Sequence, residues 1–189
     1  MVNKVLICDI DGTICKYPTD EFVTLVKSAY GVSSVTDAEI KQSLSEKEYK
    51  SIKEKYRFGG EKFKVPVYPE AVEVINNLYE ANVQIVFQTT RPPDPYIKSQ
   101  TCAWLTSSGF KFHNLIFNVN KKSSHFYSTS TAFFVIDDLS ENFAPYLDLP
   151  SAHCLYFKNE RLENHQNSLS NVKKVSSWCE IDIYLNSFI

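Results

Sequence analysis

Val5-Leu6-Ile7-Cys8-Asp9-Ile10-Asp11-Gly12-Thr13, close to the start of the chain, is the stretch that decides the fold. Residues 5–10 form an apolar run interrupted only at Asp9, as is typical of a strand buried on both faces of a parallel sheet. Gly12 ends this run. Because side chains alternate along a strand, we expect Asp9 and Asp11 to point the same way at the carboxyl end of a central strand.

The rest of the chain alternates between helical and extended patterns. Apolar spacing predicts helices that begin at Pro69 and near Tyr96, and a terminal helix capped by Ser176 or Ser177. A short helix is expected over 123–127. Apolar runs predict strands at 82–87, 115–117, 133–136 and 154–157, the last being the final strand. Strands that alternate with helices indicate an α/β fold with a mostly parallel sheet and helices on both faces.

Residues 20–62 interrupt this alternation. They are rich in Lys, Glu and Ser, and apolar residues recur at helical spacing from Phe22 to Tyr30. Thr36 and Ser45 each begin a capping box with a Glu three residues later, which marks two further short helices. We therefore divide the chain into a core of residues 1–19 and 63–189 and a small helical insertion of residues 20–62.

The composition is that of a soluble globular protein, with 43% hydrophobic and 22% charged residues among 189. A formal net charge of -2 gives no field to attract nucleic acid or an anionic membrane, so an anion has to be held by a local site. The first apolar run is too short for a signal peptide, and no stretch could span a bilayer. Five scattered cysteines suit reduced thiols. We expect a cytoplasmic protein with no membrane partner, and the charge argues against nucleic acid.

Polar residues follow three of the predicted strands. Asp9 and Asp11 follow the first, Thr89 the second, and the pair Asp137-Asp138 a later one. The carboxyl ends of parallel strands meet at one edge of the sheet, where such folds bind ligands. Four carboxylates gathered there would repel one another unless a cation lay among them. A set of ligands that are all oxygen atoms favours Mg²⁺, and the absence of His and Cys from this set argues against zinc. The sequence therefore predicts a magnesium site.

A magnesium ion among carboxylates suits phosphoryl transfer, which needs a nucleophile, an acid or base, and donors for the phosphate oxygens. One of Asp9 and Asp11 can attack phosphorus while the other handles the proton of the leaving group. Gly12 allows backbone amides to approach a phosphate closely. The candidate phosphate-binding residues are Gly12, Thr13, Thr89, Thr90, Arg91, Lys121 and Lys122.

Four segments resemble, in order, the motifs of the haloacid dehalogenase-like (HAD) superfamily of phosphohydrolases. Residues 9–13 resemble the first motif, and the apolar strand that ends in Thr89 resembles the second. Lys122 before Ser123 resembles the third motif, although Lys121 is adjacent, and residues 135–138 resemble the fourth. The resemblance implies a three-layer α/β/α Rossmann-like core with a small α-helical cap.

The resemblance also implies a role for each motif residue. Asp9 would be the nucleophile, and Asp11 would be the general acid/base and a ligand of Mg²⁺ through its backbone carbonyl. Thr89 would bind the phosphate. Asp138 and Asp137 would be the metal-binding pair, with either of them the direct ligand.

An insertion of this size resembles the cap by which many HAD phosphatases close over a small phosphomonoester. The resemblance thus favours a small phosphorylated substrate, a nucleotide or another metabolite, in the manner of the 5'-nucleotidases. A phosphosugar phosphatase or a phosphomutase fits the same motifs, and a polynucleotide 3'-phosphatase shares the core without support from a basic surface. A non-catalytic regulator that binds a phosphorylated partner is the alternative of another class, and intact Asp9 and Asp11 argue against it.

Overall fold

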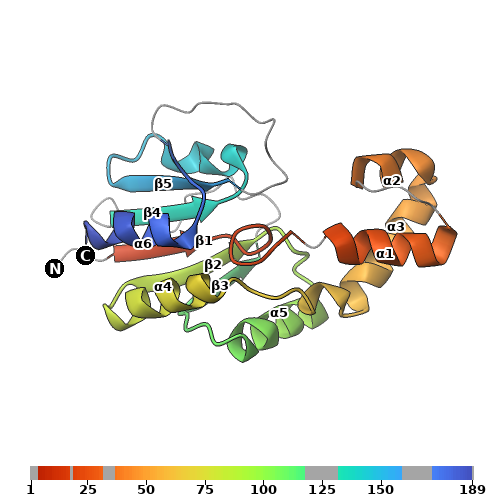
Figure 1. The fold of residues 1–189 in the computed structure, drawn as a ribbon, viewed down its shortest axis with the longest axis horizontal. Helices are drawn as coiled ribbons and strands as arrows, with labels where there is room; N and C mark the ends of the chain where they lie inside the picture. Colours follow the sequence, from red (N-terminus) through yellow and green to blue (C-terminus); the bar gives the residue numbers. More distant parts are fainter. Residues whose placement is uncertain (1–3, 18, 32–36, 118–131, 159–171, 189) are drawn as a thin grey trace.

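A six-stranded parallel sheet forms the centre of the computed structural model, which describes residues 4–17, 19–31, 37–117, 132–158 and 172–188 (Figure 1). The strand order is β3-β2-β1-β4-β5-β6, and every neighbouring pair is parallel. The strands are β1 (Lys4–Cys8), β2 (Gln84–Thr89), β3 (Asn114–Phe117), β4 (Ala132–Asp137), β5 (Ala152–Phe157) and β6 (Val172–Val175). The predicted α/β class and parallel sheet are confirmed.

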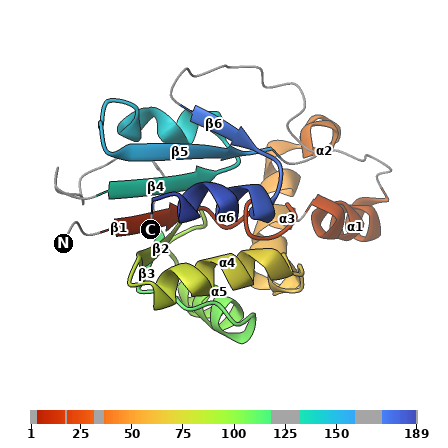
Figure 2. The same ribbon diagram turned by 60° about the vertical axis from the view of Figure 1, so that its left-hand side comes forward.

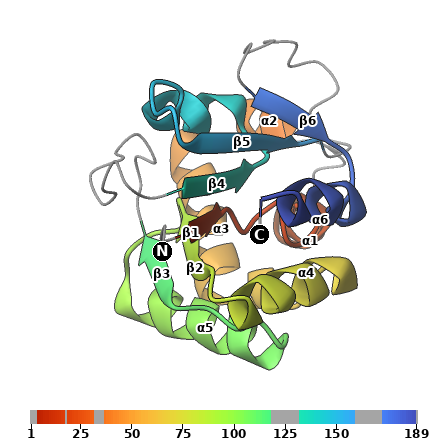
Figure 3. The same cartoon turned by 90° about the vertical axis from the view of Figure 1, so that its left-hand side faces the viewer.

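Both faces of the sheet are buried. Successive side chains of the central strands point to opposite sides, and each set packs in its own apolar cluster. The core elements outside the sheet are α4 (Pro69–Glu80), α5 (Pro95–Ser107), α6 (Trp178–Asn186) and the 3-10 helix η2 (Ser140–Tyr146). On one face, Leu6 and Cys8 belong to a cluster with residues of α4, α5 and α6. On the other face, Val5 and Ile7 pack with Phe143 and other residues of η2. Figures 2 and 3 show α4 and α6 side by side over the first face.

The core helices begin close to the predicted residues, at prolines and capping side chains. Pro69 opens α4, where its missing N–H costs nothing. The Asp94 side chain accepts hydrogen bonds from the first backbone N–H groups of α5, and Ser177, rather than Ser176, caps α6. Within the described ranges, no helix is long and apolar enough to cross a membrane.

Helices α1 (Thr19–Tyr30), α2 (Asp37–Ser43) and α3 (Glu46–Phe58) lie together beyond the carboxyl end of β1 (Figure 1). They enclose an apolar cluster separate from those of the sheet, and its buried members are Phe22, Val26, Ile40, Ile52 and Tyr56. The predicted capping box at Ser45 is present in both directions, whereas Thr36 lies outside the described residues. The 3-10 helix η1 (Glu61–Phe63) leads back to the sheet and contacts α1, α3 and α5.

Several predicted boundaries are wrong. β1 ends at Cys8, and Ile10 lies in the following turn. β2 begins at Gln84 because Asn82, with a φ of 59°, belongs to the turn after α4. β5 is not the final strand, since β6 pairs with it, and η2 was not predicted. The helix predicted over 123–127 lies outside the described residues.

Candidate functional site

The candidate site lies at the carboxyl ends of three adjacent strands. The register places Cys8 of β1 beside Phe87 of β2 and Ile136 of β4, so the residues that follow them come together. An unusual number of polar side chains is buried there, and burying such groups is costly unless they are partnered or functional. The buried polar residues of this region are Asp9, Thr13, Gln88, Thr89, Arg91, Asp137 and Asp138.

Three carboxylates form an acidic cluster, by which we mean Asp9, Asp137 and Asp138. They are only 6%, 4% and 3% exposed, and one oxygen of each lies within 4.8 Å of the others. Like charges at this separation repel strongly in a poorly hydrated site, and a cation among them removes that cost. Because all the donors are carboxylate oxygens, the cluster suits Mg²⁺, which takes oxygen ligands and keeps several waters.

The loop after β4 fixes one member of this cluster. Oδ1 of Asp137 accepts hydrogen bonds from the backbone N–H of Leu139 and from Nδ2 of Asn142, both at 2.9 Å. These contacts orient Asp137 and tie it to η2, which suits a residue that both supports the loop and faces a metal.

A tight turn follows Asp9 and holds its side chain. Gly12 has a φ of 93°, which glycine adopts without strain, and the N–H groups of Thr13 and Ile14 both point to the carbonyl of Ile10. The Thr13 hydroxyl donates to Oδ2 of Asp9 at 3.3 Å. Trp178 of α6 donates from Nε1 to the Thr13 carbonyl at 3.0 Å, which anchors the turn to the core.

Thr89 ends β2 beside this turn. Its hydroxyl is buried and accepts a hydrogen bond from the backbone N–H of Arg91 at 3.2 Å. A hydroxyl that accepts one hydrogen bond can still donate its own proton, so Thr89 can still donate a hydrogen bond to a phosphate oxygen. Thr90 is exposed.

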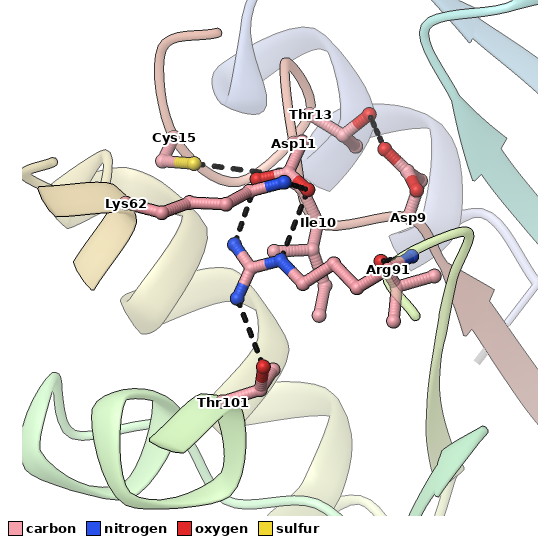
Figure 4. A network of polar contacts seen from close by, with 9 residues as sticks. Asp9, Ile10, Asp11, Thr13, Cys15, Lys62, Arg91 and Thr101 are labelled. Carbon is pink, nitrogen blue, oxygen red and sulfur yellow. Dashed lines mark hydrogen bonds and ion pairs between the residues drawn. The ribbon is translucent and has the colours of Figure 1, made fainter. Parts of the chain in front are cut away.

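Asp11 lies between two cations, and we call Asp11, Lys62 and Arg91 the Asp11 cluster (Figure 4). Arg91 donates from Nη2 to Oδ1 (2.7 Å) and from Nε to Oδ2 (3.0 Å), and Nζ of Lys62 lies 2.7 Å from Oδ2. Burial alone would raise the pKa of Asp11, but Arg91 and Lys62 outweigh it and hold that pKa well below its ordinary value. Asp11 is therefore ionised at neutral pH.

The two motif aspartates thus face different surroundings. Figure 4 shows Asp9 turned toward Thr13 and Asp11 turned toward Lys62 and Arg91. The expectation that strand alternation points them the same way is wrong, because β1 ends at Cys8, before either residue. The turn around Gly12, and not the pleat of a strand, sets the direction of Asp11.

Arg91 is held on all sides. Besides its two bonds to Asp11, it donates from Nη1 to the Thr101 hydroxyl at 3.2 Å. Its guanidinium also lies over the rings of Phe63 and Trp104, at 5.4 and 5.2 Å from their centroids. With 1% of its side chain exposed, Arg91 positions Asp11 in this arrangement. Its predicted contact with phosphate stays a prediction.

Cys15 and Tyr56 border the Asp11 cluster. Burial and the charge of Asp11 raise the pKa of the Cys15 thiol to about 12, and the same two causes raise the pKa of the Tyr56 phenol. Both groups keep their protons near neutral pH, so neither is a ready nucleophile or base. Tyr56 brings α3 to the border of the site.

The structure brings together most of the residues that the sequence selected. Asp9, Asp137 and Asp138 meet, and Thr13 donates a hydrogen bond to Asp9, whereas the Asp11 side chain has other partners. Gly12 lies in the turn after Asp9, and Thr89 ends the neighbouring strand β2. Lys121 and Lys122 lie outside the described residues. Lys62 was missed, because nothing in the sequence separates it from nearby lysines such as Lys55 and Lys64.

Comparison with known proteins shows the fold of this chain. No protein-family model matches it, and neither does any curated protein. The solved structures that resemble it include three that match over nearly their whole length. A proposed haloacid dehalogenase-like hydrolase from Burkholderia xenovorans has a TM-score of 0.65 and 12% identity, covering 99% of this chain and 98% of its own. A predicted phosphoglycolate phosphatase from Haemophilus somnus has a TM-score of 0.66 and 14% identity, with 98% and 99% covered.

The third is the D,D-heptose 1,7-bisphosphate phosphatase of B. bronchiseptica, whose structure holds magnesium and phosphate. Its TM-score is 0.57 with 11% identity, and 99% of each chain is covered. At such low identities these similarities establish a shared fold. The chain therefore has the Rossmann-like α/β fold of the HAD hydrolases.

Proposed function

We propose that this protein is a Mg²⁺-dependent phosphomonoester hydrolase that acts through an aspartyl-phosphate on Asp9. The observation that carries the proposal is the acidic cluster, in which Asp9, Asp137 and Asp138 are buried together at the carboxyl ends of β1 and β4. The HAD fold supports it, and so do the magnesium and phosphate bound to the heptose bisphosphate phosphatase of similar fold.

In the first step of the proposed reaction, a carboxylate oxygen of Asp9 attacks phosphorus, and the bond from phosphorus to the leaving oxygen breaks. Thr13 orients that carboxylate through its hydroxyl. Thr89, the backbone around Gly12 and the motif lysine, Lys122 or Lys121, would hold the phosphoryl oxygens. A magnesium ion held by Asp9, by Asp138 or Asp137, and by the Asp11 carbonyl would neutralise the charge of the carboxylates and the phosphate.

In the second step, water attacks the phosphorus of the aspartyl-phosphate, and the bond to Asp9 breaks to release inorganic phosphate. Asp11 would accept the proton of that water. Asp11 is ionised, as a proton acceptor must be, and Arg91 by itself contacts both of its oxygens. Protonation of the leaving alcohol in the first step would need Asp11 to gain a proton after substrate binds.

We further propose that residues 20–62 form a cap over a core of residues 1–19 and 63–189. Helices α1–α3 support this division, because their apolar cluster is separate from those of the sheet. A small cap suits a compact phosphorylated metabolite. A nucleotide is the specific substrate that we favour, on the strength of the motif resemblance.

A direct test uses 4-nitrophenyl phosphate with and without Mg²⁺. We expect turnover that requires the metal and falls by at least about 1,000-fold in Asp9→Asn. Asp148→Asn is the matched control, because Asp148 is exposed, and it should keep full activity. Turnover that survives both a chelator and Asp9→Asn would refute the proposal. A wild-type protein that hydrolyses no member of a panel of small phosphomonoesters would also refute it.

A further inference from the structure

Lys62 is a half-buried cation that has no role of its own in the proposed reaction. It lies in η1, the short element that joins α3 to the core, and its side chain is 19% exposed. Within the parts of the chain that the structure describes, Asp11 is its only ionic partner, at 2.7 Å. Asp11 comes two residues after Asp9 in the turn that follows β1, and Figure 4 shows the Lys62 ammonium group against the Asp11 carboxylate.

Asp11 does not need Lys62 to balance its charge. Arg91 already contacts both Asp11 oxygens, at 2.7 and 3.0 Å, in the bidentate geometry that is strongest for such pairs. Two cations therefore share one carboxylate, and the Asp11 cluster carries a surplus positive charge. We assign this surplus charge to Lys62, because Thr101 and two aromatic rings hold the Arg91 guanidinium in its pairing with Asp11.

Only one of these cations can reach a ligand. The Arg91 side chain is 1% exposed and spends its donors on Asp11 and Thr101. The Lys62 ammonium group has three N–H donors and uses one of them on Asp11, which leaves two for an incoming acceptor. A desolvated cation that is incompletely balanced favours an anion as that acceptor.

We propose that Lys62 binds a second anionic group of the substrate, a carboxylate or another phosphate, away from the phosphoryl group that is transferred. The inference rests on the proposed function and narrows its substrate class to compact phosphomonoesters with two acidic groups. Lys62 is then a specificity-determining residue. It comes from the junction between the cap and the core, where it can contact a group that projects away from Asp9.

Pairs of substrates that differ only in the second charge test this inference. We choose phosphoglycolate with phosphoglycolamide, and 4-carboxyphenyl phosphate with 4-carbamoylphenyl phosphate, so that two distances from the phosphoryl group are sampled. For the wild-type protein with Mg²⁺, we expect kcat/KM to favour the carboxylate of at least one pair by about tenfold or more, mainly through KM.

Variants of Lys62 then assign the preference. Lys62→Met should reduce the ratio to about one, and Lys62→Arg should restore part of it. Any effect of Lys62→Met on Asp11 changes kcat/KM of both members of a pair alike and cancels in the ratio. Lys64→Met is the control, because Lys64 lies on the same turn, is exposed and pairs with Glu61. It should keep the full preference. Thermal unfolding of each variant identifies any that fails to fold, and Lys62→Gln provides a second neutral replacement.

Binding to the Asp9→Asn protein separates this inference from the proposed function, since Kd can be measured by calorimetry without turnover. A Kd ratio of about tenfold that depends on Lys62 supports the inference even if no substrate is hydrolysed. Hydrolysis of both members of each pair at equal kcat/KM, or a preference that survives Lys62→Met, overturns the inference and leaves the phosphatase proposal standing.

Discussion

The acidic cluster and the Asp11 cluster lie side by side, but the first gathers like charges and the second pairs opposite ones. The acidic cluster gathers three buried carboxylates within 4.8 Å, whereas the Asp11 cluster surrounds one carboxylate with two cations. Asp9 and Asp11 are two residues apart in the chain, yet each belongs to a different cluster. The contrast teaches that a short motif can place two carboxylates in opposite electrostatic surroundings, because the turn at Gly12 sends their side chains in different directions.

Removing Arg91 should have the largest effect on stability. Arg91→Met leaves Asp11 without its bidentate partner, and breaking a buried ion pair from one side costs about 3–5 kcal/mol of unfolding free energy. Urea unfolding at neutral pH measures this loss. Lys111→Met is the matched control, because Lys111 pairs with Glu80 at 2.6 Å on the surface, and an exposed pair contributes about 1 kcal/mol or less. Equal losses in the two variants would contradict a special role for the Asp11 cluster.

Magnesium should stabilise the protein through the acidic cluster. At a concentration about 100-fold above Kd, Mg²⁺ should add about 2.7 kcal/mol to the unfolding free energy. Asp138→Asn should remove most of this gain, because it takes away one charged ligand, while the exposed control Asp148→Asn should keep it. Thermal unfolding with Mg²⁺ and with chelator measures the difference. A gain that survives in Asp138→Asn would show that the ion binds elsewhere.

Much of the fold could be predicted from apolar runs and helix-capping signals, and the exceptions have physical causes. β6 escaped prediction because Lys173 and Lys174 are exposed on an edge strand, which leaves no apolar run to detect. The start of β2 was placed two residues early because Asn82 and Val83 continue the alternation of polar and apolar residues while the backbone still turns.

The acidic cluster was predictable for a topological reason, since the ends of neighbouring parallel strands must meet. The Asp11 cluster was not, because its contacts depend on distant segments. Arg91 is 80 residues from Asp11 in the sequence, and Lys62 comes from the end of the helical segment. No local pattern states which of several lysines is buried against a carboxylate.

The smallest expected effect is the loss of unfolding free energy at acid pH that comes from the Asp11 cluster. The pKa of Asp11 is depressed in the folded protein from an ordinary value of 3.8, because Arg91 and Lys62 favour its ionised form. Ionised Asp11 therefore stabilises the fold fully above about pH 4, and this stability is lost as pH falls from there toward the depressed pKa. Asp11→Asn lacks the titrating group, so the difference in unfolding free energy between wild type and variant should be constant from pH 7 to pH 5.

The same difference should then shrink steadily between about pH 4 and pH 2, since the wild-type carboxyl gains a proton in the unfolded chain before it does in the folded one. Urea unfolding of both proteins across this range, with chelator present to keep the acidic cluster free of metal, gives the comparison. A difference that stays flat below pH 4 would mean that Arg91 and Lys62 do not lower the pKa of Asp11, which would then titrate in the folded protein as it does in the unfolded chain.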